Sequence, residues 1–201
     1  ARAHFKLNSQ ESVVTVFGGS RGAQSINRAI EKNLPELLAR TQLIHITGDN
    51  PDFARMQAQK DNLDESLRGR YFITRYLDEE MPFALGAASL VIARAGAATL
   101  GEFPAARVPS VLVPYPYAGQ HQDKNAEFLA ARGAAIKVED ARLETDLLPA
   151  VIGLLDDANR MVEMSAHAGA LSRPDAADKI SDTLFEIARQ RTSSDQRLTE
   201  P

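Results

Sequence analysis

Hydrophobic side chains fall along the chain into short apolar runs that alternate with stretches of helical spacing. Residues 13–17 (VVTVF) form a continuous run rich in β-branched side chains, which is typical of a strand covered on both faces. From residue 23 to residue 40 the apolar positions recur every three or four residues, which predicts a helix. Pro35 lies inside this pattern and predicts a kink or a short restart.

The alternation continues to residue 140, and beyond it the pattern is helical only. Further strands are predicted at residues 42–48, 70–77, 89–96, 109–116 and 134–140. Further helices are predicted at residues 51–60, 79–88, 97–107, 123–133, 143–155, 157–169 and 174–191. This order indicates an α/β fold, here a Rossmann-like, doubly wound parallel sheet of about six strands that ends in helices. We expect residues 1–191 to form one domain and residues 192–201 to be a polar tail.

Composition narrows the class of protein. The 201 residues are 44% hydrophobic and 25% charged, which suits one well-packed domain. The chain has no cysteine, and this excludes a disulfide framework, a thiol nucleophile and a thiolate metal site. A net charge of −4 gives no broad basic face, so we expect no nucleic-acid partner. The N-terminal segment is polar, unlike a signal peptide, and no apolar run approaches the ~20 residues of a membrane span.

The first predicted strand stops at Gly18 and Gly19, and Ser20 follows before the next helix. Glycines let a backbone come close to a ligand, and the N–H groups and dipole of a helix N-terminus favour an anion. The segment therefore predicts a phosphate or pyrophosphate site; the alternative is a tight turn without a ligand. No lysine stands where a Walker A loop needs one. A nicotinamide fingerprint fits poorly, because Asp49 comes after Gly48 rather than at the end of the second strand.

The segment ARAGAATLGE, residues 93–102, repeats this arrangement at the end of the fourth predicted strand. Small side chains at Ala97 and Ala98 leave room for a ligand to reach backbone N–H groups. Glu102 lies one helical turn beyond Thr99, and its carboxylate can accept hydrogen bonds from the two hydroxyls of a ribose. The alternative for Glu102 is a carboxylate that only favours the helix dipole.

A polar cluster follows the fifth predicted strand in VPYPYAGQHQDKNAE, residues 113–127. Its amide and imidazole side chains, among them His121 and Gln122, suit sugar hydroxyls, because such hydroxyls both donate and accept hydrogen bonds. The alternative is that Asp123 caps the next helix and the other side chains are solvated.

Three motifs together resemble the carboxy-terminal half of the MurG family in their order and spacing. They are FGGSRGAQSIN, ARAGAATLGE and VPYPYAGQHQDKNA. That family consists of peptidoglycan glycosyltransferases, which transfer N-acetylglucosamine from UDP-N-acetylglucosamine to undecaprenyl-pyrophosphoryl-N-acetylmuramyl-pentapeptide. The resemblance implies a GT-B fold of two Rossmann-like domains, of which this chain is similar to the carboxy-terminal, donor-binding one. It implies no metal and no cofactor.

The resemblance also implies which residues bind the donor. The pyrophosphate would be faced by Gly18, Gly19 and Ser20. Backbone N–H groups would be offered to the sugar and the phosphates by Ala97, Ala98 and Thr99. Leu77 would read the uracil edge through its backbone, and Glu102 would bind the ribose hydroxyls. His121 and Gln122 would hold the N-acetylglucosamine.

Three positions depart from the family's usual pattern and bear on donor preference. Arg21 stands where glutamine is usual, Ala95 where serine is usual, and Gln120 where an acid is frequent.

No catalytic residue is expected in this chain. An inverting transfer needs a base that deprotonates the acceptor hydroxyl, and the resemblance assigns that base to the family's other half. His4 and His167 lie in segments remote from the motifs, and His45, inside a predicted strand, is expected to be buried and satisfied.

The resemblance gives the lipid-linked acceptor and the membrane-facing surface to the same other half. We therefore expect the full-length protein to be cytoplasmic and peripheral, at the inner face of the cell membrane. Two alternatives remain: a stand-alone nucleotide-sugar binding subunit that completes its cleft with a partner chain, and a Rossmann-type dinucleotide-binding domain of an oxidoreductase. An exposed apolar patch around YLDEEMPFAL, residues 76–85, would favour the first.

Overall fold

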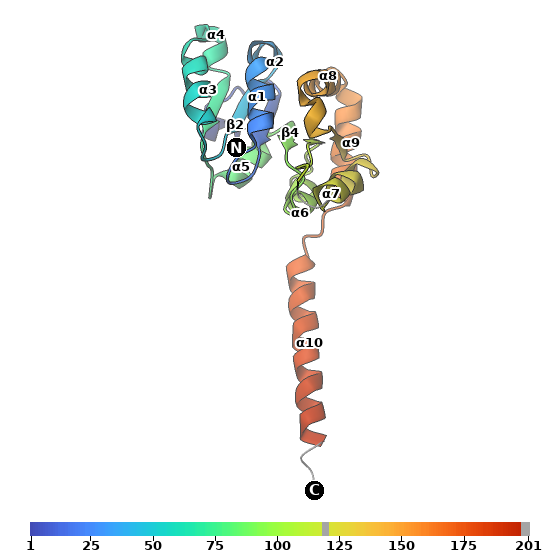
Figure 1. The fold of residues 1–201 in the computed structure, drawn as a ribbon. Helices are drawn as coiled ribbons and strands as arrows, with labels where there is room; N and C mark the ends of the chain where they lie inside the picture. The colour runs from blue at the N-terminus through green and yellow to red at the C-terminus, as the bar shows by residue number, and fades with distance from the viewer. Residues whose placement is uncertain (118–120, 198–201) are drawn as a thin grey trace.

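The computed structural model describes residues 1–117 and 121–197, with side chains described as far as residue 189. At its centre is a parallel six-stranded sheet with the order β3-β2-β1-β4-β5-β6, and helices pack on both faces (Figure 1). The predicted α/β class and doubly wound parallel sheet are confirmed.

The elements alternate as the hydrophobic pattern predicts. The strands are β1 (Val13–Phe17), β2 (Gln42–Ile46), β3 (Tyr71–Thr74), β4 (Leu90–Ala93), β5 (Ser110–Leu112) and β6 (Ala135–Lys137). The α-helices are α1 (Gln24–Lys32), α2 (Leu34–Arg40), α3 (Asp52–Asp61), α4 (Glu65–Arg68), α5 (Met81–Ala87), α6 (Thr99–Ala106), α7 (His121–Ala130), α8 (Leu143–Leu155), α9 (Ala158–Ala170) and α10 (Ala176–Arg197). Two 3-10 helices are η1 (Arg2–Phe5) and η2 (Asp140–Arg142).

The register of the sheet places the ends of three neighbouring strands side by side. Phe17, the last residue of β1, pairs with Ala93 of β4, and Ala93 pairs with Leu112 of β5. The segments that follow these strands therefore leave the same edge of the sheet next to one another. Ligands of open α/β sheets bind outside the carboxyl ends of the strands, so this edge is where the site is expected.

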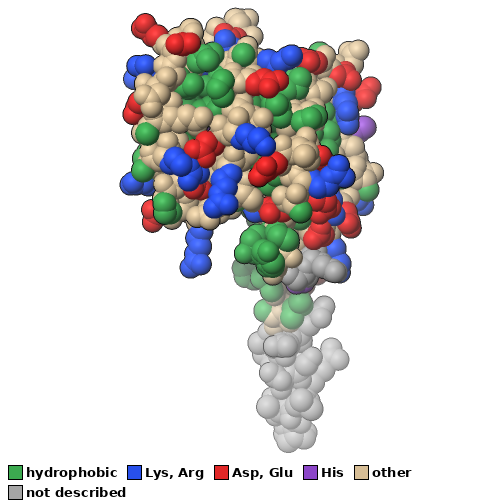
Figure 2. Space-filling model, turned by 45° about the horizontal axis from the view of Figure 1, so that its top comes forward, with side chains coloured by type: hydrophobic (Ala, Val, Ile, Leu, Met, Phe, Trp, Pro, Cys, Tyr) green, Lys and Arg blue, Asp and Glu red, His purple; other side chains and the backbone are tan. Residues whose placement is uncertain are grey.

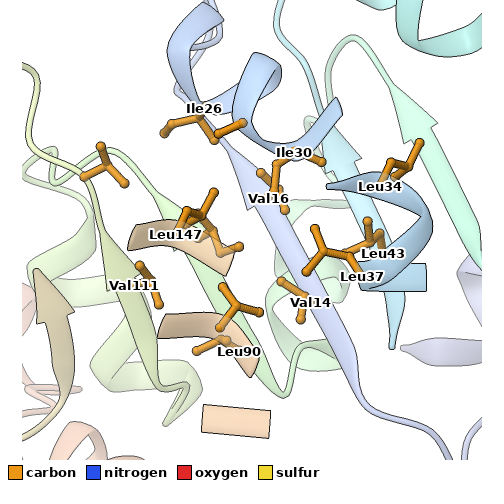
Figure 3. Packing of buried hydrophobic residues seen from close by; sticks show 14 of the residues in the cluster. Val14, Val16, Ile26, Ile30, Leu34, Leu37, Leu43, Leu90, Val111 and Leu147 are labelled. Atoms are coloured by element: carbon orange, nitrogen blue, oxygen red, sulfur yellow. The ribbon is translucent and has the colours of Figure 1, made fainter. Parts of the chain in front are cut away.

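The sheet is held between apolar layers that the helical periodicity predicts. Figure 3 shows Ile30 of α1 next to Val16 of β1, and Leu37 of α2 next to Leu43 of β2. All four side chains are at most 1% exposed. A large apolar side chain buried in this way contributes about 1.5–3 kcal/mol relative to its exposed state, so this layer holds α1 and α2 against the sheet.

The interruption predicted at Pro35 is confirmed. The first helix, α1, ends at Lys32, and α2 begins at Leu34 with Pro35 in its first turn. A proline there loses no hydrogen bond, because the first N–H groups of a helix have no partner within it.

The N-terminal segment is polar in composition but buries two apolar side chains. Phe5 and Leu7 are 4% and 8% exposed, and the ring of Phe5 meets that of Phe72 edge to face at 5.0 Å between centroids. His4 stacks on Phe83 at 5.2 Å. Single apolar residues among polar ones carry no periodic signal, so only the tertiary contacts reveal their burial.

The last helix is longer than predicted. α10 runs from Ala176 to Arg197 and so enters the segment 192–201 that was expected to be a polar tail; residues 198–201 lie outside the described residues. In Figure 1 this helix extends away from the rest of the molecule. Four of its apolar side chains are at least 47% exposed: Ile180, Leu184, Phe185 and Ile187.

Charges are mixed over the surface drawn in Figure 2, where acidic and basic side chains are interspersed rather than gathered by sign. Within the part of the chain that the structure describes, no helix combines the length and the apolarity needed to cross a bilayer.

Candidate functional site

Three connections leave the carboxyl edge of the sheet from neighbouring strands. They are the glycine loop (residues 18–23) after β1, the alanine loop (residues 94–98) after β4, and the proline loop (residues 113–117) after β5. The three sequence motifs therefore lie together, although up to about a hundred residues separate them along the chain.

The glycine loop folds back tightly on the helix that follows it. The N–H of Gly22 donates to the Gly19 carbonyl at 2.8 Å, and the φ angles of Gly19 and Gly22 are 87° and 71°. A Cβ on Gly18 would lie 2.2 Å from the Ala23 nitrogen, whereas one on Gly19 would meet nothing within 4 Å. Ser20 is exposed, and among the described residues no backbone hydrogen bond uses the N–H groups of Gly19 and Ser20. The glycine loop therefore packs tightly against the chain at Gly18, and it leaves the N–H groups of Gly19 and Ser20 open just before α1, where a helix dipole favours an anion.

The alanine loop is a turn that leads into α6. Ala97 and Ala98 are exposed, and in the described part of the chain no backbone hydrogen bond uses their N–H groups. The N–H and the hydroxyl of Thr99 both donate to the Gly96 carbonyl, at 3.1 and 2.6 Å. Thr99 is 3% exposed and so shapes the turn. Glu102 lies exposed in the first turn of α6.

Two side-chain amides tie the proline loop and α7 to their surroundings. The Oε1 of Gln122 accepts the Tyr115 N–H at 2.9 Å, and the Nδ2 of Asn125 donates to the Ala95 carbonyl at 2.9 Å. The second contact joins α7 to the alanine loop. The sequence alone gives no signal for the contact of Asn125, because its partner lies thirty positions away along the chain.

The other members of this polar cluster have different surroundings. His121 begins α7 and is exposed, and Gln120 lies outside the described residues. Asp123 lies inside α7 rather than before it, and its carboxylate pairs with Lys137 at 2.9 Å. The hydrogen bond that the Lys137 ammonium donates to the Asp123 carboxylate raises the pKa of Lys137 above its ordinary value. Asp123 therefore joins α7 to β6.

A pocket of about 550 Å³ lies between α5 and α6. Asp78 and Met81 line it from one side, and Glu102 and Ala105 line it from the other. Leu77, the neighbour of Asp78, is half-buried and packs in the same cluster as Met81. Glu102 therefore lines a mostly apolar pocket of the size that small-molecule sites have, and Leu77 precedes another residue of its lining.

The second strand ends in a way that disfavours a dinucleotide. A Cβ on Gly48 would lie 2.1 Å from the Gly22 nitrogen, so the chain after β2 presses on the glycine loop. The Nδ2 of Asn50 fastens this contact by donating to the carbonyls of Arg21 and Thr47, at 3.0 and 2.7 Å. A dinucleotide site needs an acid at this strand end to bind a ribose, and a glycine backbone stands there instead.

A buried polar network lies beneath the glycine loop. The Nδ1 of His45 is 2.9 Å from the Tyr71 hydroxyl, and its Nε2 is 3.1 Å from the Asn27 Oδ1. The Nδ2 of Asn27 donates to the Thr47 carbonyl and to an Asp52 oxygen, both at 3.0 Å. Burial lowers the pKa of His45 to about 3, against the opposite effect of the Asp52 charge. The prediction that His45 is buried and satisfied is confirmed.

In the described residues, no three His, Asp or Glu side chains lie where they could hold a metal ion together. His167 lies against Gly133, beyond the end of α7.

Comparisons with known proteins agree with this geometry. A family model described as the glycosyltransferase family 28 C-terminal domain matches residues 13–180. The UDP-N-acetylglucosamine--N-acetylmuramyl-(pentapeptide) pyrophosphoryl-undecaprenol N-acetylglucosamine transferase of Roseiflexus sp. (strain RS-1) is 40% identical over 212 residues, covering 96% of this chain and 48% of the relative. The relative of the same name from Chlorobium luteolum is 42% identical over 192 residues, covering 94% and 50%. The chain thus spans about half the length of the curated relatives it matches.

Solved structures give the same result. The crystal structure of Acinetobacter baumannii MurG matches with a TM-score of 0.74 and 27% identity, covering 92% of this chain and 53% of that one. The UDP-GlcNAc 2-epimerase of Neisseria meningitidis, solved with UDP-GlcNAc, matches with a TM-score of 0.66 at 11% identity and shares the fold alone, over 92% of this chain and 47% of that one. The resemblance to the carboxy-terminal half of MurG is therefore confirmed, and the chain belongs to the glycosyltransferase family 28 C-terminal domain family.

Proposed function

We propose that this chain binds UDP-N-acetylglucosamine as the donor half of an inverting glycosyltransferase. In the complete enzyme, the sugar passes to undecaprenyl-pyrophosphoryl-N-acetylmuramyl-pentapeptide, as the names of the relatives from Roseiflexus and Chlorobium state for them. One observation carries the proposal. In the glycine loop and in the alanine loop, two consecutive N–H groups make no backbone hydrogen bond among the described residues, and the two loops follow neighbouring strands.

These N–H groups suit a diphosphate. Gly19 and Ser20 precede α1, and Ala97 and Ala98 precede α6, so the positive ends of two helix dipoles add to the hydrogen bonds. When the bond between the sugar and UDP breaks, negative charge grows on the departing diphosphate. Donors that are already oriented stabilise this charge without reorganising. The Ser20 hydroxyl supplies a further donor.

The other predicted residues bind the rest of the donor. Glu102 accepts hydrogen bonds from the ribose hydroxyls, and the backbone of Leu77 reads the uracil at the pocket between α5 and α6. His121 and Gln122 hold the N-acetylglucosamine from the start of α7. Thr99 contributes by holding the alanine loop in shape through its bonds to Gly96.

The acceptor and its activation belong to the other half of the enzyme in this proposal. Deprotonation of the acceptor hydroxyl requires a base, and we assign none to the residues described here. The chain alone binds the donor without turning it over. The complete enzyme works in the cytoplasm as a peripheral protein at the inner face of the cell membrane, where a lipid-linked acceptor is accessible.

A second candidate is a separate donor-binding subunit whose acceptor half is another chain. Two exposed aromatic side chains in the predicted patch, Tyr76 and Phe83, favour it, since they are 56% and 49% exposed and would be covered by a partner. Both candidates use the same donor site. The coding sequence upstream of residue 1 distinguishes them, because only the first requires an acceptor domain in the same reading frame.

Titration calorimetry with UDP and UDP-N-acetylglucosamine tests the proposal, with NAD as the control ligand. We expect both uridine ligands to bind and NAD not to bind. Glu102→Ala should weaken UDP binding by about 1–3 kcal/mol, because it removes the partner of two hydroxyls that the complex buries. Glu163→Ala, an exposed glutamate on α9, is the matched control and should bind UDP as the unaltered chain does. Failure of the unaltered chain to bind either uridine ligand would refute the proposal.

A further inference from the structure

Arg94 is a nearly buried cation at the carboxyl edge to which the proposed function gives no task. It follows β4 directly, and its side chain is 11% exposed. Its Nη2 donates to the Ser25 hydroxyl at 2.8 Å, and its Nη1 donates to the carbonyls of Val113 and Pro114 at 3.2 and 3.1 Å. The same Nη1 pairs with Asp140 at 2.6 Å.

Arg94 joins the alanine loop, in which it lies, to the proline loop and to the first turn of α1, which follows the glycine loop. Ser25 lies in the first turn of α1, just after the glycine loop. Val113 and Pro114 begin the proline loop, and Arg94 itself begins the alanine loop. The Ser25 hydroxyl donates in turn to Asp140 at 2.7 Å, so serine, arginine and aspartate form a closed ring of polar contacts.

The chemistry of a guanidinium makes this arrangement rigid. It is planar and always charged, and its fixed fork of N–H donors bonds in set directions, whereas a lysine ammonium is a flexible point charge. Asp140 neutralises the charge of Arg94, and the ring of Tyr115 lies 5.3 Å from the guanidinium carbon. Because the guanidinium is already bonded to these protein groups, Arg94 is suited to affect a ligand indirectly, by holding the loops that contact the ligand.

We propose that Arg94 is a positioning residue that sets the distance between the glycine loop and the alanine loop, so that one diphosphate reaches the N–H groups of both. Ser25 transmits this placement to α1, and Asp140 holds the arginine in orientation. The inference rests on the proposed function. It goes further by naming the part of the donor that depends on the network, namely the diphosphate, which spans both loops, and not the nucleoside, which lies at the α5–α6 pocket.

Ser25→Ala tests this inference with little risk to folding, since it removes one hydroxyl from a half-buried position. Dissociation constants are measured for UDP by calorimetry and for uridine by NMR titration, and unfolding in urea is followed in parallel. We expect Ser25→Ala to weaken UDP binding roughly tenfold, the scale of one hydrogen bond to a charged group, and to leave uridine binding within about twofold. Ser25→Thr keeps the hydroxyl and should restore UDP binding. Arg94→Lys should weaken UDP binding at least as much as Ser25→Ala does, and it should also leave uridine binding unchanged.

The outcomes separate this inference from the proposed function. If Ser25→Ala and Ser25→Thr bind UDP as tightly as the unaltered chain, the inference is wrong and the donor site stands. If UDP and uridine binding weaken equally, the network only stabilises the fold, and the positioning role is wrong. If the unaltered chain binds neither UDP nor uridine, the proposed function falls and the inference falls with it.

Discussion

The buried His45 makes the stability of this protein depend on pH in a way that one substitution can isolate. Its ring is fully buried between the Tyr71 hydroxyl and the Asn27 side chain, and burial lowers its pKa from 6.5 to about 3. The folded chain therefore keeps this imidazole neutral throughout the range from pH 7 to pH 4. In the unfolded chain the same group is in water and takes up a proton as the pH falls below about 6.5.

The sign and the size of the effect follow from proton linkage. Below pH 6.5 the unfolded state binds one more proton at His45 than the folded state, so lowering the pH favours unfolding. The free energy of unfolding should therefore fall by about 1.4 kcal/mol per pH unit between pH 6 and pH 4 on account of this group. Between pH 7 and pH 5 the loss from His45 alone amounts to about 2 kcal/mol.

Urea unfolding at pH 7, 6 and 5 measures this loss, with His45→Gln as the comparison. The variant lacks the titrating ring but keeps every exposed carboxylate, so the difference between the two pH profiles reports His45. The variant should be less stable at pH 7, because the Tyr71 hydroxyl and the Asn27 amide lose part of their hydrogen bonding. From pH 7 to pH 5 the gap should close by about 2 kcal/mol. Parallel profiles would refute the reasoning, since they would mean that His45 titrates alike in both states.

Two further pairs of substitutions test the packing that supports the site, each by urea unfolding. Gly22→Ala places a Cβ 1.9 Å from the Thr47 carbonyl oxygen at a φ of 71°, so it should cost more than about 2 kcal/mol and impair UDP binding. Gly153→Ala, in the last turn of α8 with open space around it, should instead stabilise by about 0.5–1 kcal/mol; equal effects of the two changes would contradict the geometry. Leu147→Ala, at a side chain 1% exposed, should cost about 2–5 kcal/mol. Leu184→Ala on α10, 62% exposed, should change stability by no more than about 0.5 kcal/mol, and a loss as large as that of Leu147→Ala would mean that α10 is packed.

Local chemistry explains which parts of the site were predictable. Glycine is the residue that tolerates φ angles such as the 87° of Gly19, so the turn after the first strand is visible in the letters. Small residues before Thr99 mark the second turn because they leave its backbone accessible. Which N–H groups stay open in that turn was not predictable, because the hydroxyl and N–H of Thr99 select Gly96 only once the turn has its geometry.

The order of strands and helices also follows from the sequence alone. Continuous β-branched runs suit strands covered on both faces, and apolar spacing of three to four residues suits helices packed on them. The interruption at Pro35 belongs to the same class, since it depends only on a missing N–H. These features depend only on residues that are close in sequence, so they do not depend on where the segment lies in the fold.

The tertiary structure decides everything that depends on which segments meet. The order β3-β2-β1-β4-β5-β6 sets Phe17 beside Ala93 and so brings the glycine loop and the alanine loop to neighbouring strand ends. The contact of Gly48 with Gly22 and the ring of Arg94, Ser25 and Asp140 join residues that are far apart in sequence. No periodic pattern records such pairings, because each residue's own neighbours along the chain are the same whether or not the contact forms.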